Sequence, residues 1–105
     1  KVFKAHYSLN HLSIAYILHS IGKLHQVNNK PDDAMECYRK ALRVYKLIVG
    51  KDDNKDRDYD EAVAMEMSGV MADVLHNIGA VYEIRFEFEA SMTNYKDALE
   101  MYKSK

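Results

Sequence analysis

The sequence predicts an all-α fold, an α-solenoid made of two copies of one helical hairpin. The main observation is an internal repeat, because Leu18-His19-Ser20-Ile21-Gly22 returns 57 residues later as Leu75-His76-Asn77-Ile78-Gly79. The chain of 105 residues contains 1 proline and 4 glycines, and its apolar residues recur at three- and four-residue steps, as in amphipathic helices. A duplicated helical unit of this kind buries its apolar face by stacking on its neighbour, which is the principle of a repeat protein.

The repeat continues after each glycine at matched distances. The matched pairs are Ala34 and Ser91, Met35 and Met92, Tyr38 and Tyr95, Ala41 and Ala98, Leu42 and Leu99, Tyr45 and Tyr102, and Lys46 and Lys103. We expect the glycines and the small residues to let the two helices of a pair approach closely, and the tyrosines to fill the space between successive pairs.

This spacing resembles the tetratricopeptide repeat, a helix-turn-helix unit with a glycine, an aromatic residue and small residues at fixed offsets. The first copy departs from the pattern at His25, where the second copy has the usual aromatic residue, Tyr82. Both copies have leucine where the family has tryptophan. In addition, the segment from Ala41 to Asp52 resembles the joint between repeats of the kinesin light chain. In that joint, a leucine-rich helix runs into a turn similar to Leu-Gly-x-Asp-His-Pro.

The N-terminal segment shows a weaker form of the same joint, with Asn10-His11 in the place of Asp-His and Leu12 in the place of the proline. The resemblance therefore implies that residues 1–8 are the end of a preceding repeat's second helix. We expect the array to begin before the first residue of this chain.

Residues 9–49 form the first predicted repeat. Its first helix is expected from Leu9 or Ser13 to Val27, and its second from Pro31 to about Val49, because proline suits the first helical position and Gly50 suits a helix end. The buried stripe expected on the first helix consists of Ile14, Ile17, Leu18, Ile21 and Leu24.

Residues 50–58 are predicted to be an acidic loop, and residues 59–105 the second repeat. The repeat spacing exceeds the roughly 34 residues of a plain repeat, so the first helix of this repeat is expected to be extended, from Tyr59 to Arg85. Asp58 is expected to cap the start of this helix, with Glu61 reaching back in a capping-box arrangement. Ser68-Gly69 leave open whether this segment is one helix or two. Its apolar stripe is expected to pack within the array or to dock a partner; this stripe is Ala62, Val63, Met67, Val70, Met71 and Val74.

Composition limits the classes of function. The formal net charge of -1 lacks the basic excess that binding to a phosphate backbone requires, so nucleic acid is not an expected partner. No apolar run reaches the roughly 18 residues that span a bilayer, so the chain is not expected to cross a membrane. Cys37 is the only cysteine, which excludes an internal disulfide and favours the cytoplasm or another reducing intracellular compartment.

No catalytic residue, metal site or cofactor is predicted. Acidic side chains alternate in the loop as in an EF-hand, but Arg57 and Val63 occupy the glycine and glutamate positions of that motif. His19 and His25 are six residues apart and do not share a helix face. Cys37 has no neighbouring base in the sequence and is expected to be a buried small residue. The alternating loop residues are Asp52, Asn54, Asp56, Asp58 and Asp60.

The family resemblance implies a concave groove lined by the first helices of the pairs. The groove positions are Tyr16, His19, Ser20, Lys23 and Gln26 in the first repeat, and Asp73, His76, Asn77, Ala80 and Glu83 in the second. Asn77 matches the asparagine with which the family holds an extended peptide, because an amide both donates and accepts. Ser20 replaces it in the first repeat. The cation pairs that clamp a C-terminal carboxylate in chaperone-binding relatives are absent, since only Lys23 qualifies.

These observations predict a protein-interaction scaffold, not an enzyme, that binds an extended or helical segment of a partner protein. The alternatives are a structural subunit buried in a large assembly and a regulatory repeat domain of a larger protein. Self-association or a larger assembly is also expected, because two repeats are fewer than the roughly three that a stable solenoid needs.

Overall fold

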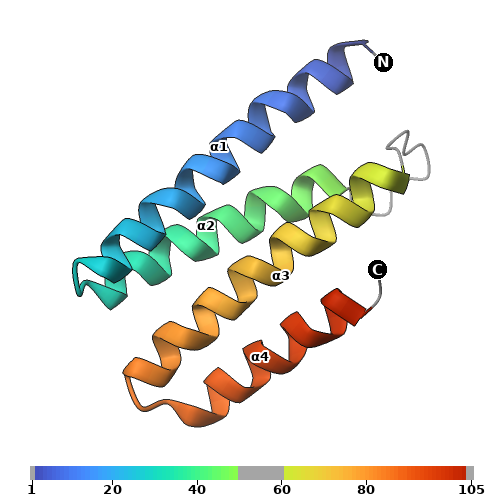
Figure 1. Cartoon of the computed structure of the whole chain (residues 1–105). Helices are drawn as coiled ribbons and strands as arrows, with labels where there is room; N and C mark the ends of the chain where they lie inside the picture. The colour runs from blue at the N-terminus through green and yellow to red at the C-terminus, as the bar shows by residue number, and fades with distance from the viewer. Residues whose placement is uncertain (1, 50–60, 104–105) are drawn as a thin grey trace.

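The computed structural model describes the backbone of residues 2–49 and 61–103, and the side chains of residues 11–48 and 66–103. It contains the helices α1 (Val2–Val27), α2 (Pro31–Val49), α3 (Glu61–Ile84) and α4 (Phe88–Lys103). The helices form two hairpins, α1 with α2 and α3 with α4, and α2 packs against α3 (Figure 1). No strand occurs among the described residues, and the predicted all-α solenoid is confirmed.

The two hairpins close through the same turn. Asn29 and Phe86, which are equivalent in the repeat, both have left-handed backbones, with φ of 64° and 63°. The following residue donates its backbone N–H back to the end of the helix: Lys30 to the His25 carbonyl at 2.8 Å, and Glu87 to the Tyr82 carbonyl at 2.9 Å. The repeat seen in the sequence therefore extends to the backbone geometry of its turns.

The motif glycines lie directly against the second helix of their own pair. A Cβ atom built on Gly22 would stand 2.6 Å from Cε1 of Tyr38, and one built on Gly79 would stand 2.8 Å from Cδ1 of Tyr95. Real Cβ contacts are not that short, so each tyrosine ring occupies the space that any larger residue would need. The predicted close approach of the two helices is confirmed.

The core is one cluster that joins the first three helices. From α1 and α2 it contains Ala15, Ala34, Met35, Tyr38, Ala41 and Tyr45, and from α3 it contains Met67, Met71, Val74, Ile78 and Val81. α4 covers the other side of α3 and buries Ser91 and Ala98. The Ser91 hydroxyl donates to the Gly79 carbonyl at 2.8 Å, so the small residues do serve close helix packing.

α1 differs from the prediction at its start. A helix boundary was expected at Leu9 or Ser13, but α1 begins at Val2 and passes through both positions without a break. The unbroken helix has a local cause. Leu12 stands at the position of the proline in the kinesin-light-chain joint, and leucine, unlike proline, keeps the backbone N–H that a helix needs. The assignment of residues 1–8 to a preceding repeat stays a prediction.

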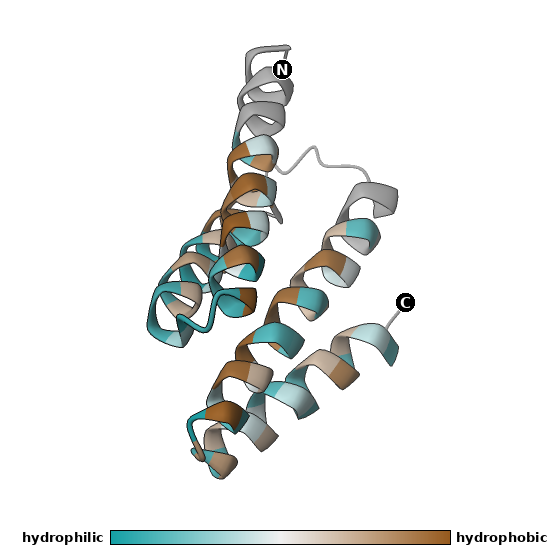
Figure 2. Cartoon of the chain, turned by 60° about the vertical axis from the view of Figure 1, so that its left-hand side comes forward, coloured by the Kyte–Doolittle hydropathy of each residue, from teal (hydrophilic) through white to brown (hydrophobic). Residues whose placement is uncertain are grey.

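The buried stripe predicted on α1 is also wrong. Ile14, Ile17, Ile21 and Leu24 are between 38% and 63% exposed, and only Leu18 of that stripe is half-buried. Instead, α2 packs against the side of α1 that carries Ala15, His19 and Gly22, and Asn77 of α3 reaches His19 on this side. Figure 2 shows that hydrophobic (brown) residues recur from turn to turn along α1.

α3 settles the alternative that the sequence left open, because it is a single helix that runs through Ser68 and Gly69. Of its predicted apolar stripe, Met67, Met71 and Val74 are buried in the core, so this face packs within the array. The acidic loop, the proposed cap Asp58 and Tyr59 lie outside the described residues.

Candidate protein-interaction groove

The predicted groove residues lie on α1 and α3, and a hydrogen bond joins these two helices. Nδ2 of Asn77 lies 2.9 Å from Nε2 of His19. An amide nitrogen only donates, so the histidine nitrogen in this pair accepts and carries no proton. The two repeats are therefore bridged along the line where the resemblance places the groove.

The environment of His19 favours this neutral imidazole. The residue is only 7% exposed, and burial, followed by the positive charge of Lys23, lowers its pKa, while Asp73 acts weakly in the opposite direction. Desolvation penalises the charged form of a base, so His19 stays an acceptor near neutral pH.

Tyrosines of the second helices hold matching groove residues in both repeats. The hydroxyl of Tyr38 donates to Oε1 of Gln26 at 2.5 Å, and that of Tyr95 donates to Oε1 of Glu83 at 2.8 Å. The four residues are two pairs of repeat equivalents. Burial raises the pKa of Tyr38 to about 12, so its hydroxyl stays protonated and can keep donating.

A second tyrosine position serves the two repeats differently. In the second repeat the hydroxyl of Tyr102 donates to Asp73, and this hydrogen bond, with burial, raises the pKa of Tyr102 to about 12. The equivalent Tyr45 is fully buried, and its hydroxyl has no hydrogen-bond partner among the described residues. The cause is a sequence difference, because the position of Asp73 is held by Tyr16 in the first repeat.

Each repeat also sets the motif histidine against a tyrosine ring. The rings of His19 and Tyr38 meet edge to face at 5.8 Å, and those of His76 and Tyr95 are tilted at 5.3 Å. His76 remains exposed despite this ring contact, whereas His19 is buried.

The structure thus divides the predicted groove residues into three groups. His19 is a correction, because it was expected to face a bound chain but is buried under Asn77 and the Tyr38 ring. The half-buried residues are Ser20, Gln26, Asn77 and Ala80, and the exposed residues are Tyr16, Lys23, Asp73, His76 and Glu83.

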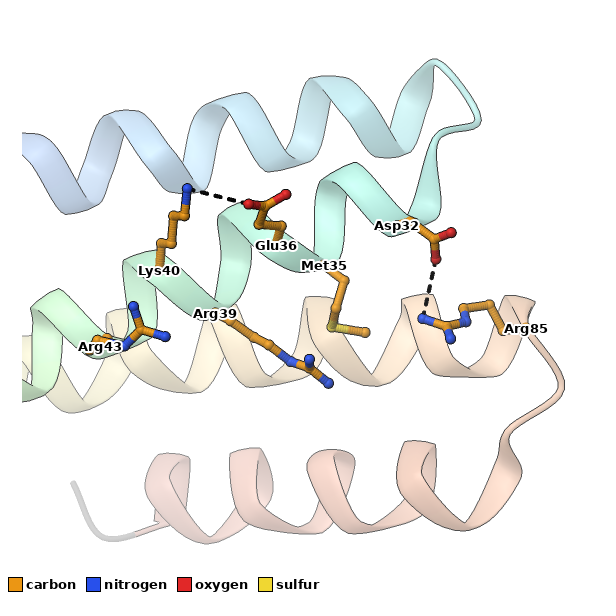
Figure 3. A pocket seen from close by; sticks show the side chains of 7 residues that line it. All are labelled: Asp32, Met35, Glu36, Arg39, Lys40, Arg43 and Arg85. Atoms are coloured by element: carbon orange, nitrogen blue, oxygen red, sulfur yellow. Dashed lines mark ion pairs between the residues drawn. The ribbon is translucent and has the colours of Figure 1, made fainter.

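Sequence reasoning missed a polar joint between α2 and the end of α3. A shallow pocket of about 380 Å³ lies there, lined by Asp32, Met35, Glu36, Arg39, Lys40, Arg43 and Arg85 (Figure 3). Arg85 pairs with Asp32 at 3.4 Å, and Nη2 of Arg39 donates to the Tyr82 hydroxyl at 2.5 Å. The four-residue spacing of Arg39 and Arg43 is the signal that could have marked this face of α2.

Other kinds of site find no support in the part of the chain that the structure describes. No group of three or more His, Cys, Asp or Glu side chains there could hold a metal ion. Cys37 is half-buried, not fully buried as expected; burial, followed by the negative charge of Glu36, raises its thiol pKa and disfavours a nucleophilic thiolate. None of the described helices combines the length and the apolar character needed to cross a bilayer.

Comparison with known proteins agrees with this architecture. A family model of the tetratricopeptide repeat matches residues 14–55 and 71–105, so its two matches start 57 residues apart, like the two motif copies. No curated protein and no solved structure matches the chain. Tetratricopeptide repeats are non-catalytic scaffolds that generally mediate protein–protein interaction. The two matches cover most of the sequence, and the chain therefore belongs to the tetratricopeptide repeat family.

Proposed function

We propose that this chain binds an extended or helical segment of a partner protein along the groove formed by α1 and α3. The observation that carries the proposal is the set of exposed polar side chains at groove positions of two bridged helices. Beneath them, Tyr38, Tyr95 and Tyr102 hold Gln26, Glu83 and Asp73 in fixed hydrogen bonds. Binding groups that are already oriented lose less conformational entropy when a ligand arrives.

The charges of the groove suggest the chemistry of the bound segment. Asp73 and Glu83 on α3 are exposed carboxylates, each with acceptor capacity left after its tyrosine hydrogen bond. Lys23 on α1 supplies a donor. We therefore propose a segment that presents N–H groups or a basic side chain to α3 and an acceptor to α1.

Asn77 is the proposed contact to the partner's backbone. Its Nδ2 is used by His19, while its Oδ1 accepts no hydrogen bond from the described residues. Asn77 is half-buried, and its neighbour His76 is exposed. We propose that Oδ1 of Asn77 accepts a hydrogen bond from a backbone N–H of the bound chain, with His76 beside it.

Two finer assignments are also proposals. The kinesin-light-chain type of repeat is supported by the segment from Ala41 to Asp52 and by the first family match, residues 14–55, which is about eight residues longer than a plain repeat. A reducing intracellular compartment is supported by the single cysteine, Cys37.

The proposal is tested by selecting ligands for the immobilised chain from a library of displayed random peptides and measuring their affinities. The double variant His76→Ala/Asn77→Ala should weaken binding about 2- to 12-fold for each hydrogen bond lost, from about 0.5–1.5 kcal/mol per bond. The control variant Glu36→Ala/Lys40→Ala removes an exposed ion pair of α2 and should leave affinity unchanged.

Unchanged affinity of the groove variant, with unchanged helicity, would move the binding site off the concave face. It would then favour the second candidate, a structural subunit of a larger assembly. That candidate is supported by the exposed apolar side chains of α1 and α4.

A further inference from the structure

The same four positions of the repeat are buried in α3 and open in α1. Met71, Val74, Ile78 and Val81 of α3 are at most 5% exposed and share the core cluster with α2. Their equivalents in α1, 57 residues earlier, are between 38% and 63% exposed, and we call them the α1 face: Ile14, Ile17, Ile21 and Leu24. Steps of three and four residues place each set on one side of its helix.

The second helices of the two pairs, α2 and α4, differ in a corresponding way, because positions covered in α2 are exposed in α4. Met35 and Tyr45 of α2 are buried in the cluster next to α3, and Leu42 packs against it. Their equivalents in α4 are between 42% and 56% exposed, and we call them the α4 face: Met92, Leu99 and Tyr102. The side chains are of the same type at all three positions, so α4 repeats the surface with which α2 covers α3.

The two faces lie at opposite edges of the molecule. α1 and α4 are the outer helices of the layer, with α2 and α3 between them (Figure 1). A single chain therefore presents both halves of the α2–α3 joint but cannot bring its own halves together.

We propose that copies of this chain associate head to tail, with the α4 face of one copy packed on the α1 face of the next. The new contact reproduces the α2–α3 joint inside each chain. It uses two different surfaces, so it does not close on itself, and growth continues beyond the dimer. The occupant is a second copy because the complementary helix is present in this same sequence.

The polar contacts of the internal joint have counterparts at the proposed one. Inside the chain these contacts are Asp32 with Arg85, Arg39 with Tyr82 and His19 with Asn77. Between copies, the repeat register pairs Glu89 with Asn28, Lys96 with His25 and His76 with Ser20. Each of these pairs can combine a donor with an acceptor, but none of them joins a carboxylate to a cationic side chain. The contact between copies is therefore weaker than the joint within the chain.

Sedimentation velocity of the full chain at pH 8, over a series of concentrations, tests the proposal. The weight-average mass should rise with concentration and pass that of a dimer. Ile17→Glu on the α1 face and Leu99→Glu on the α4 face should each abolish this growth. Both side chains are 55% exposed, so both variants should keep the helicity of the parent by circular dichroism.

Mixing the two variants is the decisive step. The Ile17→Glu copy keeps an intact α4 face and the Leu99→Glu copy keeps an intact α1 face, so an equimolar mixture should form a dimer and stop there. Leu47→Glu is the matched control, because Leu47 is 66% exposed and belongs to neither face, and this variant should assemble like the parent.

Several results would overturn the proposal. A parent chain that stays monomeric at every concentration would do so, as would a mixture that remains monomeric. A Leu99→Glu variant that still dimerises would point to a symmetric contact of two α1 faces. Loss of assembly in Leu47→Glu would show unspecific hydrophobic association. None of these measurements depends on the peptide groove.

Discussion

Replacing Gly22 with alanine should destabilise the first helical pair through one defined clash. The new Cβ would stand 2.6, 2.8 and 3.2 Å from three carbons of the Tyr38 ring. That ring is fully buried, and its hydroxyl is bonded to Gln26. The ring therefore has no open space into which it can turn.

The size of the effect follows from two opposing contributions. Alanine in the middle of a helix is favoured over glycine by about 1 kcal/mol. Overpacking costs about 1–3 kcal/mol, and a displaced Tyr38 hydroxyl loses a hydrogen bond of about 0.5–1.5 kcal/mol. We expect Gly22→Ala to lower the free energy of unfolding by about 1–3 kcal/mol.

Gly79→Ala is the natural comparison, because it makes the same change in the second repeat. Its Cβ would meet Tyr95 at 2.8 and 2.9 Å, and the Ser91 carbonyl oxygen at 3.3 Å. Tyr95 is only half-buried and can turn toward solvent, so the overpacking is largely relieved. This variant should lose no more than about 1 kcal/mol.

Urea unfolding followed by circular dichroism, at one fixed protein concentration, measures both variants. A background of Tyr38→Leu removes the ring, and there Gly22→Ala should become stabilising by about 1 kcal/mol, since helix propensity alone remains. The reasoning is refuted if Gly22→Ala is as stable as the parent, or if its penalty persists without the Tyr38 ring.

Three further predictions concern pH, backbone strain and assembly. Burial lowers the pKa of folded His19, so the unfolded chain takes up the proton first; stability should be full above about pH 6.5 and fall as the pH drops below it. Unfolding free energies at successive pH values check this, and a slope that is unchanged in His19→Gln would contradict it. Phe86 occupies a left-handed backbone that asparagine tolerates better, so Phe86→Asn should stabilise by about 0.5 kcal/mol and Asn29→Phe should destabilise, as measured by thermal unfolding. If copies associate, the midpoint of thermal unfolding should rise with protein concentration, and Leu99→Glu should remove that dependence; a concentration-independent midpoint in the parent would argue against association.

The sequence alone determined the features that depend on local geometry. Gly22 and Gly79 mark where two helices meet because any side chain there would occupy the space of a tyrosine ring. Pro31 marks the start of α2 because its missing donor is not needed at that position. The repeat register also gave equivalent residues equivalent turns, and it gave Tyr38 and Tyr95 equivalent hydrogen bonds.

The tertiary structure decided which surfaces are covered. An apolar stripe predicts that a helix face is suited to burial, but it does not identify the neighbour, so Ile17 was expected inside and lies outside. The motif histidines show the same limit most clearly. His19 and His76 both follow leucine in matching motifs, yet Asn77 of α3 and the Tyr38 ring cover His19, while none of the described helices takes the equivalent place beside α3 to bury His76. Burial depends on which helices pack together, and that is a property of the stacked repeats, not of either motif alone.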